Sequence, residues 1–183
     1  LYNSGESTKH IDWKVYARTN RLYTKKYEEE TNLRCQFILD NSSSMHFPSI
    51  EDPSPKNLNK IYFSCLMIAS LGKLMEKQRE AAGLSVFNDK LELNTEQKSS
   101  FKQYTYIYDS LQQIFQQKNK TTRTTNIGNL DKIVAKLKRR SLIIVFSDLF
   151  KNLNDSSDLF KTLKHLKFNK HQVILFHVYD SDK

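Results

Sequence analysis

Hydrophobic residues occur along this chain in two patterns, short unbroken apolar runs and longer stretches with helical spacing. The unbroken runs predict strands buried on both faces, whereas apolar residues that recur every three or four positions predict helices. The two kinds of element alternate, which is typical of a mainly parallel sheet covered by helices on both faces. The predicted strands are 34–40, 83–87, 141–147 and 172–179, with a turn at 88–89 leading into 90–93, and the predicted helices are 58–77, 104–117, 130–137 and 156–166.

Composition supports one globular domain in a chain of 183 residues, of which 38% are hydrophobic and 27% charged. The two cysteines, Cys35 and Cys65, exclude a disulfide scaffold and a four-cysteine zinc site, and we expect both to be reduced packing residues of a cytoplasmic protein. The longest apolar stretch, 61–75, contains Lys73 and is shorter than the roughly 20 residues that span a bilayer. We therefore expect no transmembrane segment in this chain.

The amino-terminal residues are polar, basic and aromatic rather than apolar. The first ten residues lack the hydrophobic core of a signal peptide. Because the chain begins at Leu1 and not at a methionine, we expect that an upstream segment is missing. Any association with a membrane would then come through parts outside this chain.

Acidic residues follow three of the predicted strands, at Asp40, Asp148 and Asp180. Ligands of parallel sheets bind at the carboxyl ends of the strands, so these ends are the candidate site. The loop after the first strand reads Asp40-Asn-Ser42-Ser-Ser44, which places a carboxylate and two hydroxyls at every second position. Oxygen ligands of this kind suit a hard cation such as Mg²⁺, whereas the alternative is a serine-rich loop whose hydroxyls cap backbone groups.

Two later segments extend this pattern to a known kind of metal site. Thr125 precedes a predicted helix and Asp148 ends a predicted strand. Together with the Asp-x-Ser-x-Ser loop they resemble the metal-ion-dependent adhesion site of von Willebrand factor A domains. Thr125 fits the family's pattern better than Thr124 because it lies two residues before Ile127, although helix N-capping also explains threonines at this place.

The resemblance becomes more specific upstream. The segments that carry it are His10-Ile-Asp-Trp-Lys14, Ala17-Arg-Thr19, the basic and aromatic stretch that ends in Glu28-Glu-Glu30, and Arg139-Arg-Ser141 followed by Ser147-Asp148. In this order and at this spacing, the chain resembles the bacterial "domain of unknown function 58" family over nearly its whole length.

The resemblance implies a three-layer α/β/α sandwich of von Willebrand factor A type, with a mainly parallel central sheet, over residues 33–183. The N-terminal segment 1–32 would pack on that domain. It also implies a non-enzymatic protein-interaction module that works with a MoxR-type AAA+ ATPase or its client in assembling or maturing a protein complex. A partner carboxylate would complete the coordination of Mg²⁺ or Mn²⁺, and the site can stay unoccupied without that partner. The implied metal ligands are Asp40, Ser42, Ser44, Thr125 and Asp148.

Two alternatives remain from the residues alone. A haloacid-dehalogenase-like phosphatase also places a nucleophilic aspartate after its first strand, as Asp40 is placed, but such chemistry needs an acid two residues later and Ser42 stands there. Non-specific nucleic-acid binding rests on the segment 118–140, which holds eight Lys and Arg residues against Asp131 in a chain of net charge +9. A basic segment is more often a solvated helix face or a docking patch for an acidic protein.

Overall fold

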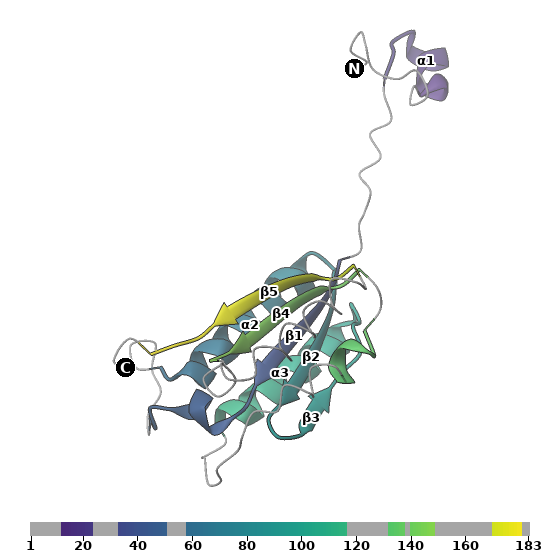
Figure 1. Cartoon of the computed structure of the whole chain (residues 1–183). Helices are drawn as coiled ribbons and strands as arrows, with labels where there is room; N and C mark the ends of the chain where they lie inside the picture. Colours follow the sequence, from purple (N-terminus) through teal and green to yellow (C-terminus); the bar gives the residue numbers. More distant parts are fainter. Residues whose placement is uncertain are drawn as a thin grey trace. The chain divides into compact units, whose positions relative to one another are not determined.

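The computed structural model describes residues 12–23, 33–50, 58–116, 132–137, 140–148 and 170–180. The chain divides into two compact units, Leu1–Thr31 and Asn32–Lys183, and each is described by itself (Figure 1). The predicted helix 156–166 and the predicted metal ligand Thr125 lie outside the described residues.

A mainly parallel sheet forms the centre of the larger unit, and its described strands follow the order β3-β2-β1-β4-β5 (Figure 1). Strand β1 pairs in parallel with β2 and β4, β4 pairs in parallel with β5, and β2 and β3 form an antiparallel pair. The strand order therefore reverses around β1, and such a reversal leaves a crevice at the carboxyl ends of the strands. The bounds are β1 Arg34–Asp40, β2 Ala81–Phe87, β3 Leu91–Asn94, β4 Leu142–Ser147 and β5 Gln172–His177.

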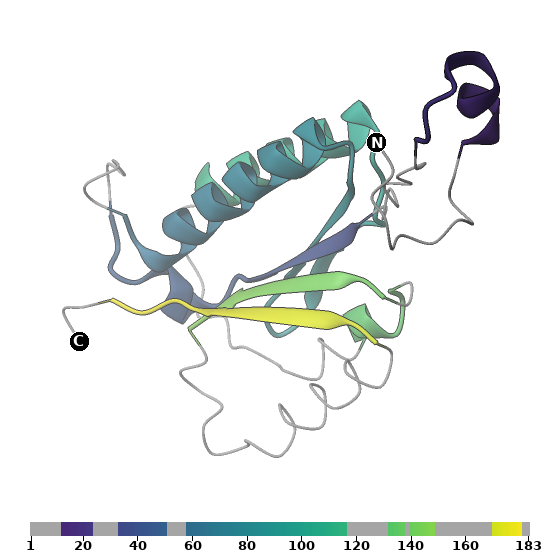
Figure 2. The ribbon, with the colours of Figure 1, turned by 90° about the horizontal axis from the view of Figure 1, so that it is seen from above.

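Helices α2 (Lys60–Lys77) and α3 (Phe101–Gln116) lie on one side of the sheet (Figure 2). The main hydrophobic core fills the space between these helices and strand residues such as Leu39 and Phe146, both fully buried. Helix α2 packs against both the sheet and α3, which explains why its apolar residues occupy nearly every face.

A second hydrophobic cluster covers the opposite side of the sheet. It joins Ile38 and Val145 of the strands to Ile133 and Val134, which belong to the helical residues 132–134. Neighbouring residues of β1 thus enter different cores, and this two-sided burial is the reason that the strand reads as an unbroken apolar run.

The smaller unit contains helix α1 (Trp13–Thr19). Asp12 caps it, since its side chain accepts hydrogen bonds from the backbone N–H groups of Lys14 and Val15 at 3.1 and 3.2 Å. The helix ends at Thr19, and Asn20 follows as its C-cap in the left-handed conformation, with φ of 52°. Trp13 is 61% exposed. The predicted packing of the N-terminal segment 1–32 on the domain stays a prediction.

The structure confirms the predicted fold class. Helix α3 begins three positions earlier than its apolar spacing indicated, because Phe101 is exposed and adds nothing to the buried face. Strand β5 ends at His177, two residues before the end of the predicted run. In the described part of the chain no helix has the length and apolarity needed to cross a membrane.

Candidate functional site

The candidate site lies where β1 and β4 end side by side. Leu39 pairs with Phe146 in the parallel register of these strands, so the residues that follow each of them meet at one edge of the sheet. Asp40 comes from β1, and Ser147 and Asp148 come from the end of β4. All three side chains are almost fully buried, at 0%, 3% and 2% exposure. The sequence therefore places two carboxylates together in the interior, where charge is costly.

Hydrogen bonds hold both oxygens of the Asp40 carboxylate. The backbone N–H of Ser42 donates to Oδ1 at 3.0 Å, and the hydroxyl of Ser147 donates to Oδ2 at 2.7 Å. Burial raises the pKa of Asp40, the bonds from Ser147 and Ser42 oppose that rise, and the negative charge of Asp148 adds to it. Asp40 is thus held in one orientation at a site that favours added positive charge.

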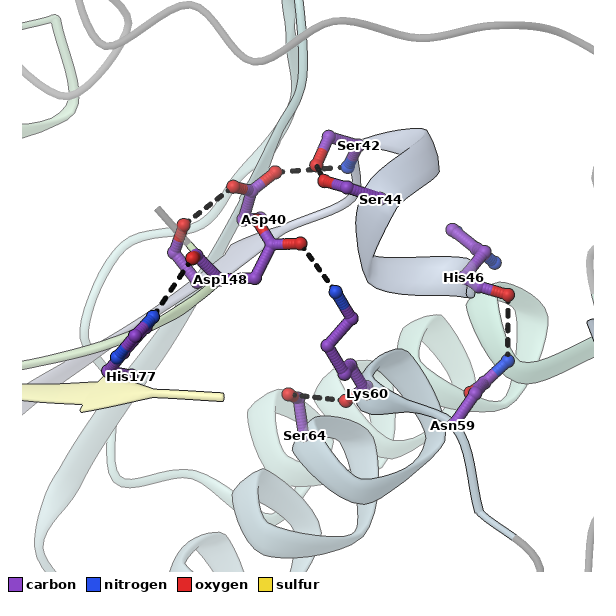
Figure 3. A network of polar contacts seen from close by, with 10 residues as sticks. Asp40, Ser42, Ser44, His46, Asn59, Lys60, Ser64, Asp148 and His177 are labelled. Atoms are coloured by element: carbon purple, nitrogen blue, oxygen red, sulfur yellow. Dashed lines mark hydrogen bonds and ion pairs between the residues drawn. The ribbon is translucent and has the colours of Figure 1, made fainter. Parts of the chain in front are cut away.

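The serine hydroxyls of the loop after β1 point to the same place (Figure 3). The Oγ atoms of Ser42 and Ser44 lie 3.0 Å apart. Ser42 precedes the short 3₁₀ helix η2 (Ser43–His46), yet its side chain makes no capping hydrogen bond to that helix. Helix capping therefore does not account for the Ser42 hydroxyl, and the two hydroxyls form an oxygen-rich surface beside Asp40.

A lysine completes the site from the first turn of α2 (Figure 3). The Nζ atom of Lys60 lies 2.7 Å from Oδ2 of Asp148, and the two side chains are only 4% and 2% exposed. The backbone carbonyl of Asp148 also lies 3.0 Å from Nε2 of His177 in β5. A positive charge at the start of a helix opposes the helix dipole, so helix propensity does not explain Lys60. The buried contact of Lys60 with Asp148 explains its presence there.

A second polar network fixes the loop that carries the serines. Asn41 donates from Nδ2 to Oε2 of Glu92 at 2.7 Å, and its Oδ1 lies 2.8 Å from Nε2 of His46. Asn59 caps α2 through its Oδ1 and donates from Nδ2 to the carbonyl of His46 at 3.2 Å. The loop after β1 is thereby tied to β3 and to α2. His46 is buried and belongs to this hydrogen-bond network.

The described donors suit a hard divalent cation. Within the described ranges no group of three or more His, Cys, Asp or Glu side chains could hold a metal. Two carboxylates and two hydroxyls supply oxygen ligands only, which fits Mg²⁺ or Mn²⁺. The structure brings Asp40, Ser42, Ser44 and Asp148 to one edge of the sheet, as the sequence predicted.

Two residues of the site, Ser147 and Lys60, were not predicted as contacts of its two aspartates. Ser147 was recognised within a motif but not as the donor to Asp40. Lys60 was missed, although a lysine directly after the capping Asn59, in an otherwise apolar helical stretch, is a signal that sequence reasoning can use.

A pocket of about 470 Å³ adjoins the site between the start of α2 and the end of β5. Lys60, Phe63, Tyr179 and Asp180 are among its lining residues. Asp180, the third acid at a strand end, therefore faces the same space as the lysine. Phe63 and Tyr179 are 42% and 68% exposed, so the pocket mixes aromatic surface with charge.

Comparison with known proteins places this geometry in context. The profile of a family described as "Protein of unknown function DUF58" matches residues 1–183. A solved structure of the conserved hypothetical protein BatB from Bacteroides thetaiotaomicron is similar with a TM-score of 0.54 and 18% identity, over 78% of this chain and 65% of that chain. An aerotolerance-related membrane protein from Bacteroides fragilis gives 0.56 and 19%, over 78% and 66%.

These two likenesses show the fold alone, and the chain spans slightly less than two thirds of each of the two structures. The SpRpn10 VWA domain is similar with a TM-score of 0.45 and 13% identity, over 78% of this chain and 74% of that chain. A comparison with curated protein sequences finds no match.

Proposed function

This chain belongs to the DUF58 family, and we propose that it is a protein-interaction module whose contact point is the polar site at the ends of β1 and β4. A divalent cation, Mg²⁺ or Mn²⁺, would join the module to its partner. Asp40 and Asp148 would anchor the ion, partly through water, and Ser42 and Ser44 would supply neutral oxygen ligands. Thr125 is the fifth proposed ligand and lies outside the described residues.

The orientation of the loop after β1 carries this proposal. The Asp40 carboxylate is held at both oxygens, and the hydroxyls of Ser42 and Ser44 converge beside it without serving as helix caps. A surface of this kind gives a cation few charges and several neutral ligands. An ion bound in this way stays under-coordinated, so a carboxylate from a partner gains a direct bond to it.

The partner is proposed to be acidic at the point of contact. A net charge of +9 favours approach of a negatively charged protein surface, in addition to the bond to the ion. Resemblance to the family supports a MoxR-type AAA+ ATPase or one of its clients as that partner, with a role in assembling or maturing a protein complex.

Binding rather than catalysis fits the residues around Asp40. A phosphatase of the haloacid-dehalogenase type needs, besides its nucleophilic aspartate, a second acid two residues later to move a proton. Here position 42 carries a serine hydroxyl, which cannot take that role. The basic segment 118–140, which motivated nucleic-acid binding, lies mostly outside the described residues.

Calorimetric titration with Mg²⁺ and Mn²⁺ tests the proposal directly. We expect saturable binding by the wild-type chain and loss of binding in the double variant Asp40→Asn/Asp148→Asn, which keeps the side-chain shapes. Asp109→Asn is a matched control, because this acid is exposed on α3 and away from the strand ends. Circular dichroism confirms that each variant folds.

A pull-down with and without the cation then follows, with a purified MoxR-type ATPase as bait. The proposal predicts capture that needs the ion and is lost in the double variant. Equal capture in the presence of EDTA would refute metal dependence, and binding of the ion by the double variant would place the ion elsewhere.

A further inference from the structure

Lys60 raises a difficulty that the proposed metal site must resolve. Its ammonium already lies 2.7 Å from Asp148, one of the two carboxylates proposed to hold the cation. An ion bound to that carboxylate would lie within a few ångströms of a buried positive charge. Repulsion between like charges is strong where water is excluded, so a divalent ion bound beside the ammonium would be unfavourable.

Charge balance among the described site residues points the same way. Asp40 and Asp148 bring two negative charges and Lys60 brings one positive charge. A divalent cation added to this set leaves an excess of positive charge in the interior, whereas the same ion without the lysine balances the two carboxylates. Buried charge is tolerated when it is balanced and costly when it is not.

The neighbouring pocket offers space into which the Lys60 side chain could move. Lys60 lines the pocket of about 470 Å³ at the end of β5, and Asp180 lines it too. A lysine side chain has a long flexible stem, so its head group can change partners while the helix stays in place. Figure 3 shows this stem reaching from the first turn of α2 to Asp148.

We propose that Lys60 is a tethered cation that occupies Asp148 in the metal-free chain and must leave it, toward the Asp180 side of the pocket, before a divalent cation binds. The site is then blocked by its own chain, and its affinity for the metal is set by this exchange. The inference rests on the proposed metal-dependent function and adds a means of regulating it.

Calorimetric titration with Mn²⁺ of the wild type, Lys60→Gln and Lys73→Gln tests the exchange. Lys73 is the matched control, since it lies on the same helix and pairs with Glu76 at the surface. We expect Lys60→Gln to bind Mn²⁺ roughly tenfold more tightly than the wild type, because the competing charge is gone. The control should bind as the wild type does.

The outcomes separate the two proposals. Saturable binding of equal affinity in the wild type and Lys60→Gln overturns the exchange and leaves the metal-dependent function standing. Binding by neither protein overturns both. Binding by Lys60→Gln alone, or much tighter binding by it, supports both.

A measurement on the unmodified chain guards against a variant that does not fold. Acetic anhydride labels accessible lysines, and mass spectrometry of the peptides gives the rate at each position. Lys60 is nearly buried, so we expect slow labelling without metal and faster labelling in saturating Mn²⁺, with no change at the exposed Lys73. A Lys60 that stays protected while Mn²⁺ is bound overturns the proposal.

Discussion

The buried pair of Lys60 and Asp148 makes a strong prediction about stability without metal. The perturbation is a double-mutant cycle made of Lys60→Met, Asp148→Asn and the two together, measured in EDTA. Methionine keeps most of the apolar stem of lysine and removes only its charge. Asparagine keeps the shape of the aspartate. The cycle therefore changes charge and leaves packing nearly constant.

The magnitude follows from burial of the two partners at 4% and 2% exposure. Removing one partner of a buried pair costs about 3–5 kcal/mol, because the other charge stays in the interior. Lys60→Met regains about 0.3–1 kcal/mol, since a cation no longer opposes the dipole at the start of α2. The double variant buries no charge from this pair, so it should cost clearly less than the two single variants added together. We expect a coupling of at least about 3 kcal/mol, which is the upper end for side chains in contact.

Urea denaturation followed by circular dichroism gives the four free energies of unfolding. Lys73→Met serves as the control, because the contact of Lys73 with Glu76 is exposed and water screens it. A coupling below about 0.5 kcal/mol would refute the reasoning, since it would mean that the two charges do not depend on each other in the folded chain.

Three further predictions concern the core and the site. Burial raises the pKa of Asp40, so its ionisation lowers the free energy of unfolding as the pH rises from the ordinary aspartate range through the raised pKa. Asp40→Asn should therefore raise the free energy of unfolding of the metal-free chain at neutral pH and flatten its pH dependence. An unchanged pH profile in urea titrations would contradict this. Burial raises the pKa values of Cys35 and Cys65 to about 12, so dithionitrobenzoate should label both thiols only in denaturant, and fast labelling of the native chain would show this to be wrong. A Cβ at Gly83 would collide with the side chain of Gln36, so Gly83→Ala should lower the unfolding free energy by about 1–3 kcal/mol, and an unshifted urea midpoint would count against it.

The strands of this fold could be predicted because they are buried on both faces. Phe37 and Ile38 enter different hydrophobic cores, and such strands lose the alternation of polar and apolar residues and read as continuous apolar runs. The candidate site at the strand ends could be predicted as well, since a carboxylate directly after a buried apolar run is unusual. The order of the strands could not, because pairing between distant segments leaves no mark on local spacing.

The residues that contact the site acids could not be predicted either, because they lie far from these acids along the chain. Lys60 and Asp148 are 88 positions apart, and Ser147 lies 107 positions from Asp40. Only the topology of the sheet brings them together. Thr125 stays a prediction, because it lies outside the described residues.

The same separations along the chain have a consequence for folding. Contacts that close loops of 88 and 107 residues carry an entropic cost, so we expect them to form only once β1 has paired with β4. Helices α2 and α3 can form and meet early, since their contacts are local by comparison. We therefore expect the site at the strand ends to be among the last parts of the chain to fold. A ligand that recognises this site would then bind only chains that have finished folding.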